Sequence, residues 1–175
     1  PPRSTLFPYT TLFRSMLNSE DKPLTYVQNG LLAAILINSG AADFVVTGCG
    51  TGEGAMLALN SFPHVLCGHI VDPADAFMFG QINDGNAIAL PFAKGFGWGA
   101  EVNLEYIFER LFQTPFGGGY PKERVVPEQR NKKILDSVKE ITHTPMTEII
   151  KKIDRDFLLE TIDRDTFKKI GRAHV

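Results

Sequence analysis

The chain has 175 residues, of which 43% are hydrophobic and 22% charged, a composition that fits one globular domain and argues against disorder. Its 18 basic and 20 acidic residues give a formal charge of -2, which leaves no basic footprint for nucleic acid, and no apolar run is long enough to span a membrane. The two cysteines, Cys49 and Cys67, are too few for a disulfide-stapled secreted scaffold, and we expect reduced thiols in the cytoplasm.

Both ends of the chain look foreign to the rest. Residues 5–15 read TLFPYTTLFRS and are identified as the in-frame translation of a common sequencing adapter, and residues 170–175 (IGRAHV) match the start of the opposite adapter. Our hypothesis is that residues 1–15 and 170–175 are assembly artefacts, which have to be excluded from fold reasoning. They would flank a truncated reading frame with an α/β domain at residues 16–142 and a helical extension at 143–169.

The pattern of apolar residues predicts alternating helices and strands. Short runs that are apolar on both faces predict buried strands at residues 44–47, 65–70 and 87–92. Helical spacing predicts helices at residues 25–39, 55–61, 72–81, 100–112, 128–141 and 146–168. Asp72 followed by Pro73 is typical of a helix start. This alternation predicts a three-layer α/β/α, Rossmann-like fold with a parallel sheet covered on both faces.

Ligands in such sheets bind at the carboxyl ends of the strands. We expect three features to meet there: the glycine-rich segment at residues 48–54 (GCGTGEG), residues 69–72, and the turn at residues 83–86 (NDGN). Glycines let the backbone approach a ligand closely, and the following helix presents free N–H groups. The glycine-rich segment is therefore expected to hold an anion or an oxyanion.

Two kinds of chemistry remain open for this loop. Residues 50–55 satisfy the G-x-G-x-x-G/A pattern of a nucleotide site with Asp72 about 20 residues on, although Glu53 would repel a pyrophosphate. Alternatively, Cys49 lies just before a helix start, where the pKa of a thiol is lowered. Cys49 or Glu53 would then move a proton next to a carbonyl group while loop N–H groups stabilise the resulting oxyanion.

Residues 43–92 carry a resemblance to a known family in the motifs VVTGCGTGEGAMLALN, VLCGHIVDPADA and INDGN. The stretch resembles the ribose-5-phosphate isomerase B and galactose-6-phosphate isomerase family, with similarity over about residues 25–139. The resemblance implies aldose–ketose isomerisation of a phosphorylated sugar through an enediol, without metal or cofactor. It also implies a five-stranded parallel sheet of order 2-1-3-4-5, a homodimer or homotetramer, and an active site across the dimer interface.

The resemblance also implies roles for particular residues. Cys49 matches the base of one branch of the family, and Glu53 matches the base of a branch in which serine replaces the cysteine; we favour Cys49 slightly. The loop whose amides hold the enediolate corresponds to Gly50, Thr51, Gly52 and Gly54. The substrate-side asparagines correspond to Asn83 and Asn86, and the candidates for the family's phosphate-binding arginines are Arg124 and Arg130.

The sequence departs from the family in two places. Ile82 stands where the family has a histidine that assists ring opening, so either His69 substitutes for it or the substrate binds already open. The family's first two strands are expected to precede Met16, which would leave the last three strands in sequence order, the strand at residues 44–47 as an exposed edge, and an inactive fragment. A nucleotide-binding α/β protein and a non-catalytic sugar-phosphate-binding protein remain the alternative functions.

Overall fold

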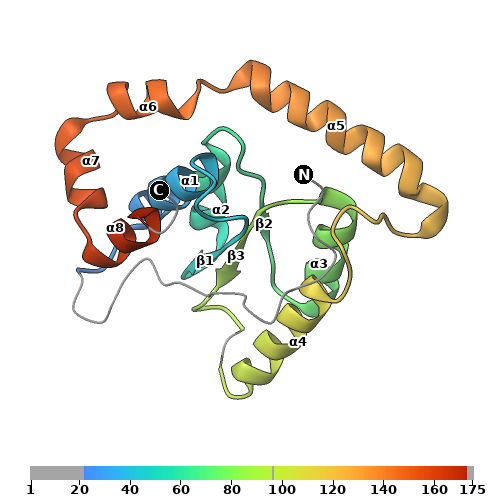
Figure 1. Cartoon of the computed structure of the whole chain (residues 1–175). Helices are drawn as coiled ribbons and strands as arrows, with labels where there is room; N and C mark the ends of the chain where they lie inside the picture. The colour runs from blue at the N-terminus through green and yellow to red at the C-terminus, as the bar shows by residue number, and fades with distance from the viewer. Residues whose placement is uncertain (1–21, 96, 173–175) are drawn as a thin grey trace.

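A computed structural model describes residues 22–95 and 97–172 of the chain. It confirms a mixed α/β fold in which helices cover both faces of a parallel sheet (Figure 1). The adapter hypothesis for residues 1–15 lies outside the described residues, as do residues 173–175. Of the other proposed adapter segment, Ile170 is described and has a buried side chain.

The sheet contains β1 (Val45–Cys49), β2 (Cys67–His69) and β3 (Ala87–Pro91). All neighbouring strands are parallel, and their order is β1-β3-β2. The expectation that the three strands follow one another in sequence order is therefore wrong. The uniformly apolar β3 takes the central position, where all five of its residues are buried, whereas β1 and β2 each pair with β3 alone among the described strands.

One face of the sheet is covered by α1 (Tyr26–Asn38) and α2 (Glu53–Asn60), and the other by α3 (Pro73–Met78) and α4 (Ala100–Phe112) (Figure 1). Each face has its own apolar core. The core beneath α1 and α2 includes Leu31, Ala55, Leu59, Val65 and Ala87. The core beneath α3 and α4 includes Ile70, Ala76, Ile88, Leu90, Ile107 and Leu111. The two cores confirm the three-layer arrangement.

Local capping chemistry explains where the helices begin. Thr25 caps α1 in a capping box with Gln28. Asp72 caps α3 by accepting a hydrogen bond from the backbone N–H of Asp75 at 2.9 Å, with Pro73 in the first turn, which confirms the predicted helix start. The last part of the expected helix at residues 72–81 is instead a π-helical turn, η1 (Phe79–Asn83).

The C-terminal part is helical but more divided than the sequence predicts. After the 3-10 turn η2 (Lys122–Arg124), α5 (Val125–Thr142) crosses from the α3–α4 side of the molecule to the other side (Figure 1). The single helix expected at residues 146–168 is wrong. The structure has α6 (Met146–Lys152), α7 (Arg155–Ile162) and α8 (Asp165–Arg172) there.

The first break in this region has a local cause. Ile153 is extended, and the Asp154 carboxylate caps the next helix by accepting from the N–H of Phe157 at 2.8 Å. The core beneath α1 and α2 also includes Met146, Ile149 and Phe157. α6 and α7 therefore pack against the same core as α1 and α2. Within the described residues, every helix is too short or too polar to cross a membrane.

Candidate functional site

The glycine-rich loop lies at the carboxyl end of the sheet, between β1 and α2. Its start is anchored to the chain that leaves β3, because the N–H groups of Phe92 and Ala93 donate to the carbonyl oxygens of Cys49 and Gly50, each at 2.9 Å. A Cβ atom on Gly48 would lie 2.3 Å from the carbonyl oxygen of Leu90 and 2.5 Å from the Phe92 ring, so no other residue fits there.

Gly52 ends the loop and begins α2. Its φ of 79° is left-handed, a conformation that favours glycine. Its carbonyl oxygen accepts from the N–H of Met56 at 3.0 Å, which forms the first turn of the helix. Glu53 is the first residue of α2 and its side chain is exposed, next to the positive end of the helix dipole.

The thiol of Cys49, the last residue of β1, is half-buried against the start of α2. Burial raises the pKa of this thiol. Hydrogen bonds donated to the sulfur by the backbone N–H groups of Ala55, Gly52 and Thr51, and by the Thr51 hydroxyl group, outweigh burial and leave the pKa below its ordinary value. The loop therefore surrounds one sulfur atom with donors that favour its thiolate form.

His69 joins this site from the end of β2. Because a carbonyl oxygen can only accept, the His69 Nε2–H must donate to the carbonyl oxygen of Thr51, at 2.8 Å. The His69 ring also lies directly over Gly52, where a Cβ atom would come within 2.7 Å of it. The structure thus brings Cys49, the glycine-rich loop and His69 together, as the sequence predicts for the carboxyl end of the sheet.

The turn at residues 83–86 does not meet these residues, so the expectation that it lies at the carboxyl end is wrong. It precedes β3 and lies at the amino end of the sheet. Asn86 connects two loops there: its Oδ1 accepts from the N–H of Leu66 at 2.8 Å and its Nδ2 donates to the carbonyl oxygen of His64 at 2.7 Å. Asn86 therefore has a structural role: its side chain joins the turn before β3 to the loop before β2, at the end of the sheet opposite Cys49.

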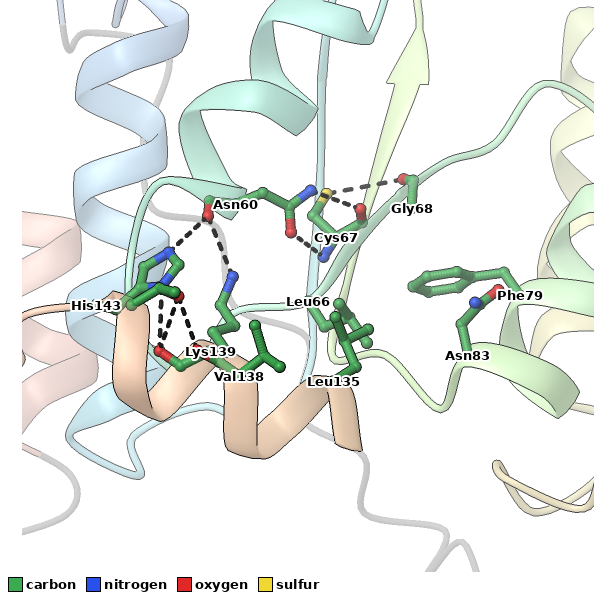
Figure 2. A pocket seen from close by; sticks show the side chains of 11 residues that line it. Asn60, Leu66, Cys67, Gly68, Phe79, Asn83, Leu135, Val138, Lys139 and His143 are labelled. Atoms are coloured by element: carbon green, nitrogen blue, oxygen red, sulfur yellow. Dashed lines mark hydrogen bonds between the residues drawn. The ribbon is translucent and has the colours of Figure 1, made fainter. Parts of the chain in front are cut away.

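Asn83 borders a cavity of about 410 Å³ between this end of the sheet and α5 (Figure 2). Beside it, the Lys139 ammonium and the His143 ring both donate to the carbonyl oxygen of Asn60, at 3.1 and 3.2 Å, and so cap the end of α2. The Asn60 side chain in turn holds both backbone groups of Cys67, at 2.8 and 2.9 Å. The sequence gives no signal for this role of Asn60, because only the fold places it beside β2.

Ionisable groups in this cavity have shifted pKa values. Burial raises the pKa of the Cys67 thiol to about 12, against a smaller opposite effect of Lys139. Burial also lowers the pKa of Lys139, opposed mainly by the nearby charge of Asp136. Cys67 is therefore an un-ionised core thiol at neutral pH, in contrast to Cys49.

The two candidate arginines lie on the same side of the molecule as Asn83. The arm that precedes them is fixed to η1 through the bond from the N–H of Gly119 to the carbonyl oxygen of Gln81 at 2.9 Å. Arg124 has a side chain that is 69% exposed and lies 3.9 Å from the Glu128 carboxylate. Arg130 is exposed on α5, where it borders a second cavity of about 520 Å³.

The candidate residues thus form two groups within one chain. The carboxyl-end group consists of Cys49, Gly50, Thr51, Gly52, Glu53, Gly54 and His69 and offers a thiol, a carboxylate and N–H donors. The other group, Asn83, Arg124 and Arg130, offers amide and guanidinium donors for an anionic or hydroxylated ligand. It is not gathered at one point, because Asn83 borders the first cavity and Arg130 the second. No cluster of three or more His, Cys, Asp or Glu side chains suited to a metal ion occurs in residues 22–95 and 97–172.

Comparison with known proteins finds similarity to sugar isomerases, both by family profile and by solved structure. The sequence profile of the family described as Ribose/Galactose Isomerase matches residues 13–127. The chain is 63% identical to a 4-deoxy-L-threo-5-hexosulose-uronate ketol-isomerase whose structure was solved with a tartrate; the match covers 89% of this chain and 73% of that one, with a TM-score of 0.86. No curated protein matches the chain.

Two further structures are named as ribose-5-phosphate isomerases. The one from Vibrio parahaemolyticus is 47% identical, covers 90% of this chain and 74% of its own, and has a TM-score of 0.86. The one from Thermotoga maritima is 26% identical over 65% of this chain and 75% of its own, with a TM-score of 0.51. The chain therefore belongs to the Ribose/Galactose Isomerase family of sugar isomerases.

Proposed function

We propose that this protein is a ketol-isomerase that interconverts an aldose and a ketose through an enediolate, with Cys49 as the base. The observation that carries the proposal is the position of the Cys49 thiol, half-buried at the end of β1 beside the start of α2. Hydrogen-bond donors there lower the pKa of the thiol despite its burial. The thiolate removes the proton from C2 of the aldose, and the electron pair of that C–H bond forms the C1–C2 double bond of the enediolate. The Cys49 thiol exchanges its proton with solvent and then donates a proton to C1, while a second proton moves from O2 to O1, so that no atom is gained or lost.

The start of α2 stabilises the negative charge that develops on the substrate oxygen. The N–H groups of the first turn and the positive end of the helix dipole are fixed in place before the reaction, as an oxyanion site requires. Glu53 lies at the same helix end with an exposed carboxylate, suited to carry the proton between O2 and O1. If Glu53 were instead the base, Cys49 would be a polar partner of the same site.

For the substrate, we propose 4-deoxy-L-threo-5-hexosulose uronate. Support comes from the 63% identity to the ketol-isomerase named for that compound and from Ile82, which stands where the family resemblance implies a ring-opening histidine. The name describes a sugar acid without a hydroxyl group on C4 and with a carbonyl group at C5. Neither hydroxyl group that closes a furanose or pyranose ring on C1 is therefore available, and an open-chain substrate needs no ring-opening residue.

A phosphorylated sugar such as ribose 5-phosphate is the second candidate substrate. It is favoured by the 47% identity to a structure named ribose-5-phosphate isomerase and by the exposed guanidinium group of Arg124, which suits a phosphate. A carboxylate satisfies the same guanidinium group. The arginine therefore fits both candidates, whereas Ile82 favours the open-chain uronate.

We further propose that the complete site forms between two copies of the chain. Cys49 lies at the carboxyl end of the sheet and Asn83 at the amino end, so one copy does not bring both groups to one ligand. A homodimer in which Asn83 and Arg124 of one protomer approach the glycine-rich loop of the other completes the donor set.

Steady-state assays with both compounds test the function. The uronate is expected to be the better substrate by kcat/KM, and Cys49→Ala to lower kcat by about 100-fold or more, as for loss of a general base. Cys67→Ala is the matched control, because it removes the other thiol without touching the loop. Turnover of neither compound by the folded wild-type protein in its full length would contradict the proposal.

A further inference from the structure

The peptide unit between Thr51 and Gly52 makes contacts at both ends. Its carbonyl oxygen, from Thr51, accepts the His69 Nε2–H at 2.8 Å. Its N–H group, from Gly52, is one of the donors to the Cys49 sulfur. In a trans peptide the C=O and N–H bonds point in opposite directions, so fixing the oxygen on one side fixes the direction of the N–H on the other.

We infer that His69 is a positioning residue: its Nε2–H holds the carbonyl oxygen of Thr51 so that the N–H of Gly52 points at the sulfur of Cys49. This inference rests on the proposed role of Cys49 and extends it to the end of β2. His69 acts through the peptide unit, from the side of the loop opposite the sulfur.

The packing of the His69 ring adds a second constraint. Gly52 is left-handed, and the Cδ2 and Nε2 atoms of His69 lie 2.7 Å from where its Cβ atom would be. The ring therefore occupies the space that the missing side chain leaves, and keeps the loop from turning the peptide over. The half-buried position of His69 at the end of β2 fixes the ring relative to the sheet.

Two substitutions separate the hydrogen bond from the packing. His69→Phe keeps a ring over Gly52 but has no N–H donor, and His69→Gln keeps an N–H donor on a side chain of similar reach. The reactivity of Cys49 toward iodoacetamide, followed from about pH 5 to pH 10 by mass spectrometry of its peptide, reports the thiolate directly. Cys67 does not interfere, because its thiol is buried with a pKa raised to about 12.

The expected result is that His69→Phe slows alkylation of Cys49 at pH 7 by about three- to tenfold, since one pKa unit is a factor of ten in thiolate. His69→Gln is expected to stay close to the wild-type profile, and so is the control His64→Asn at the other end of the sheet. Superimposable profiles for folded His69→Phe and His69→Gln, judged folded by their circular dichroism and thermal melting, would overturn the inference.

The alkylation profile does not depend on turnover, so the two proposals fail in different ways. An unchanged profile in His69→Phe together with lost turnover in Cys49→Ala overturns the role of His69 and leaves the proposed function standing. A shifted profile in His69→Phe together with full turnover in Cys49→Ala supports the positioning by His69 and overturns Cys49 as the base.

Discussion

Cys49 and Asn83 lie at opposite ends of the same three-stranded sheet, Cys49 as the last residue of β1 and Asn83 in the turn that precedes β3. Neither residue can reach a ligand bound at the other within one protomer. If both act on one substrate, they must come from different copies of the chain.

Active-site complementation follows from this separation. Cys49→Ala and Asn83→Ala are each expected to be nearly inactive alone, because both sites of the proposed homodimer would then carry the same defect. After co-expression, a mixed dimer has one intact site, so about a quarter of the wild-type activity is expected from random pairing of subunits. Activity no greater than the sum of the two separate variants would place Cys49 and Asn83 in one protomer's site or remove Asn83 from it.

Gly52→Ala tests whether the loop has space for a side chain. Gly40 is the matched control, because its φ of 73° is also left-handed but nothing lies within 4 Å of its missing Cβ atom. We expect Gly40→Ala to lower the free energy of unfolding by about 1 kcal/mol from backbone strain alone. Gly52→Ala is expected to cost about 1–3 kcal/mol more, because of the overlap with His69. Urea denaturation measures both, and equal costs would show that the ring moves aside freely.

Asn60→Ala removes the side chain that joins the end of α2 to β2. The N–H and carbonyl groups of Cys67 both lose their partner, and we expect the free energy of unfolding to fall by about 2 kcal/mol. Ser61→Ala is the control, since the neighbouring hydroxyl group is exposed and bonds only within its own helix. Chemical denaturation of the two variants gives the comparison; an Asn60→Ala protein as stable as Ser61→Ala would contradict the assigned role.

Because the Cys67 thiol is buried, we expect the free energy of unfolding to fall in alkaline solution. Its folded-state pKa is raised from 9.0 to about 12, so above pH 9 the unfolded chain releases the thiol proton before the folded chain does. The stability from this group is present below pH 9 and is lost as the pH rises toward 12. Cys67→Ala is therefore expected to lose less stability than the wild type between pH 8 and pH 10. Parallel losses in denaturation midpoints would show that the thiol ionises equally in both states.

The sequence predicts elements well where local chemistry decides them. α4 begins and ends at the residues that apolar spacing indicates, and Asp72 with Pro73 starts α3 as expected. The expectation that the turn before β3 lies at the carboxyl end of the sheet is wrong, although chain direction alone places a turn that precedes a parallel strand at the amino end. The sequence also indicates the helical break at Asp154, because aspartate is a favoured N-cap residue and Asp154 caps α7.

Other features depend on contacts between residues distant in sequence. β3 lies at the centre of the sheet because it pairs with β1 on one side and β2 on the other. The sequence of one strand does not show which other strands it will pair with. The position of the His69 ring over Gly52 depends on β2 and the loop meeting at one edge, across 16 residues of intervening chain. For the site, the sequence therefore predicts Cys49 and its glycines but not the geometry that positions them.

Solvent deuterium labelling tests most directly whether Cys49 moves the proton. The reaction is run in D₂O with 4-deoxy-L-threo-5-hexosulose uronate, and deuterium at C1 of the ketose product is followed by NMR for the wild type, Cys49→Ala and Cys67→Ala. The account predicts deuterium incorporation by the wild type and Cys67→Ala, and a rate at least about 100-fold lower in Cys49→Ala. Wild-type rates of labelled product from folded Cys49→Ala, or product without deuterium from the wild type, would contradict it.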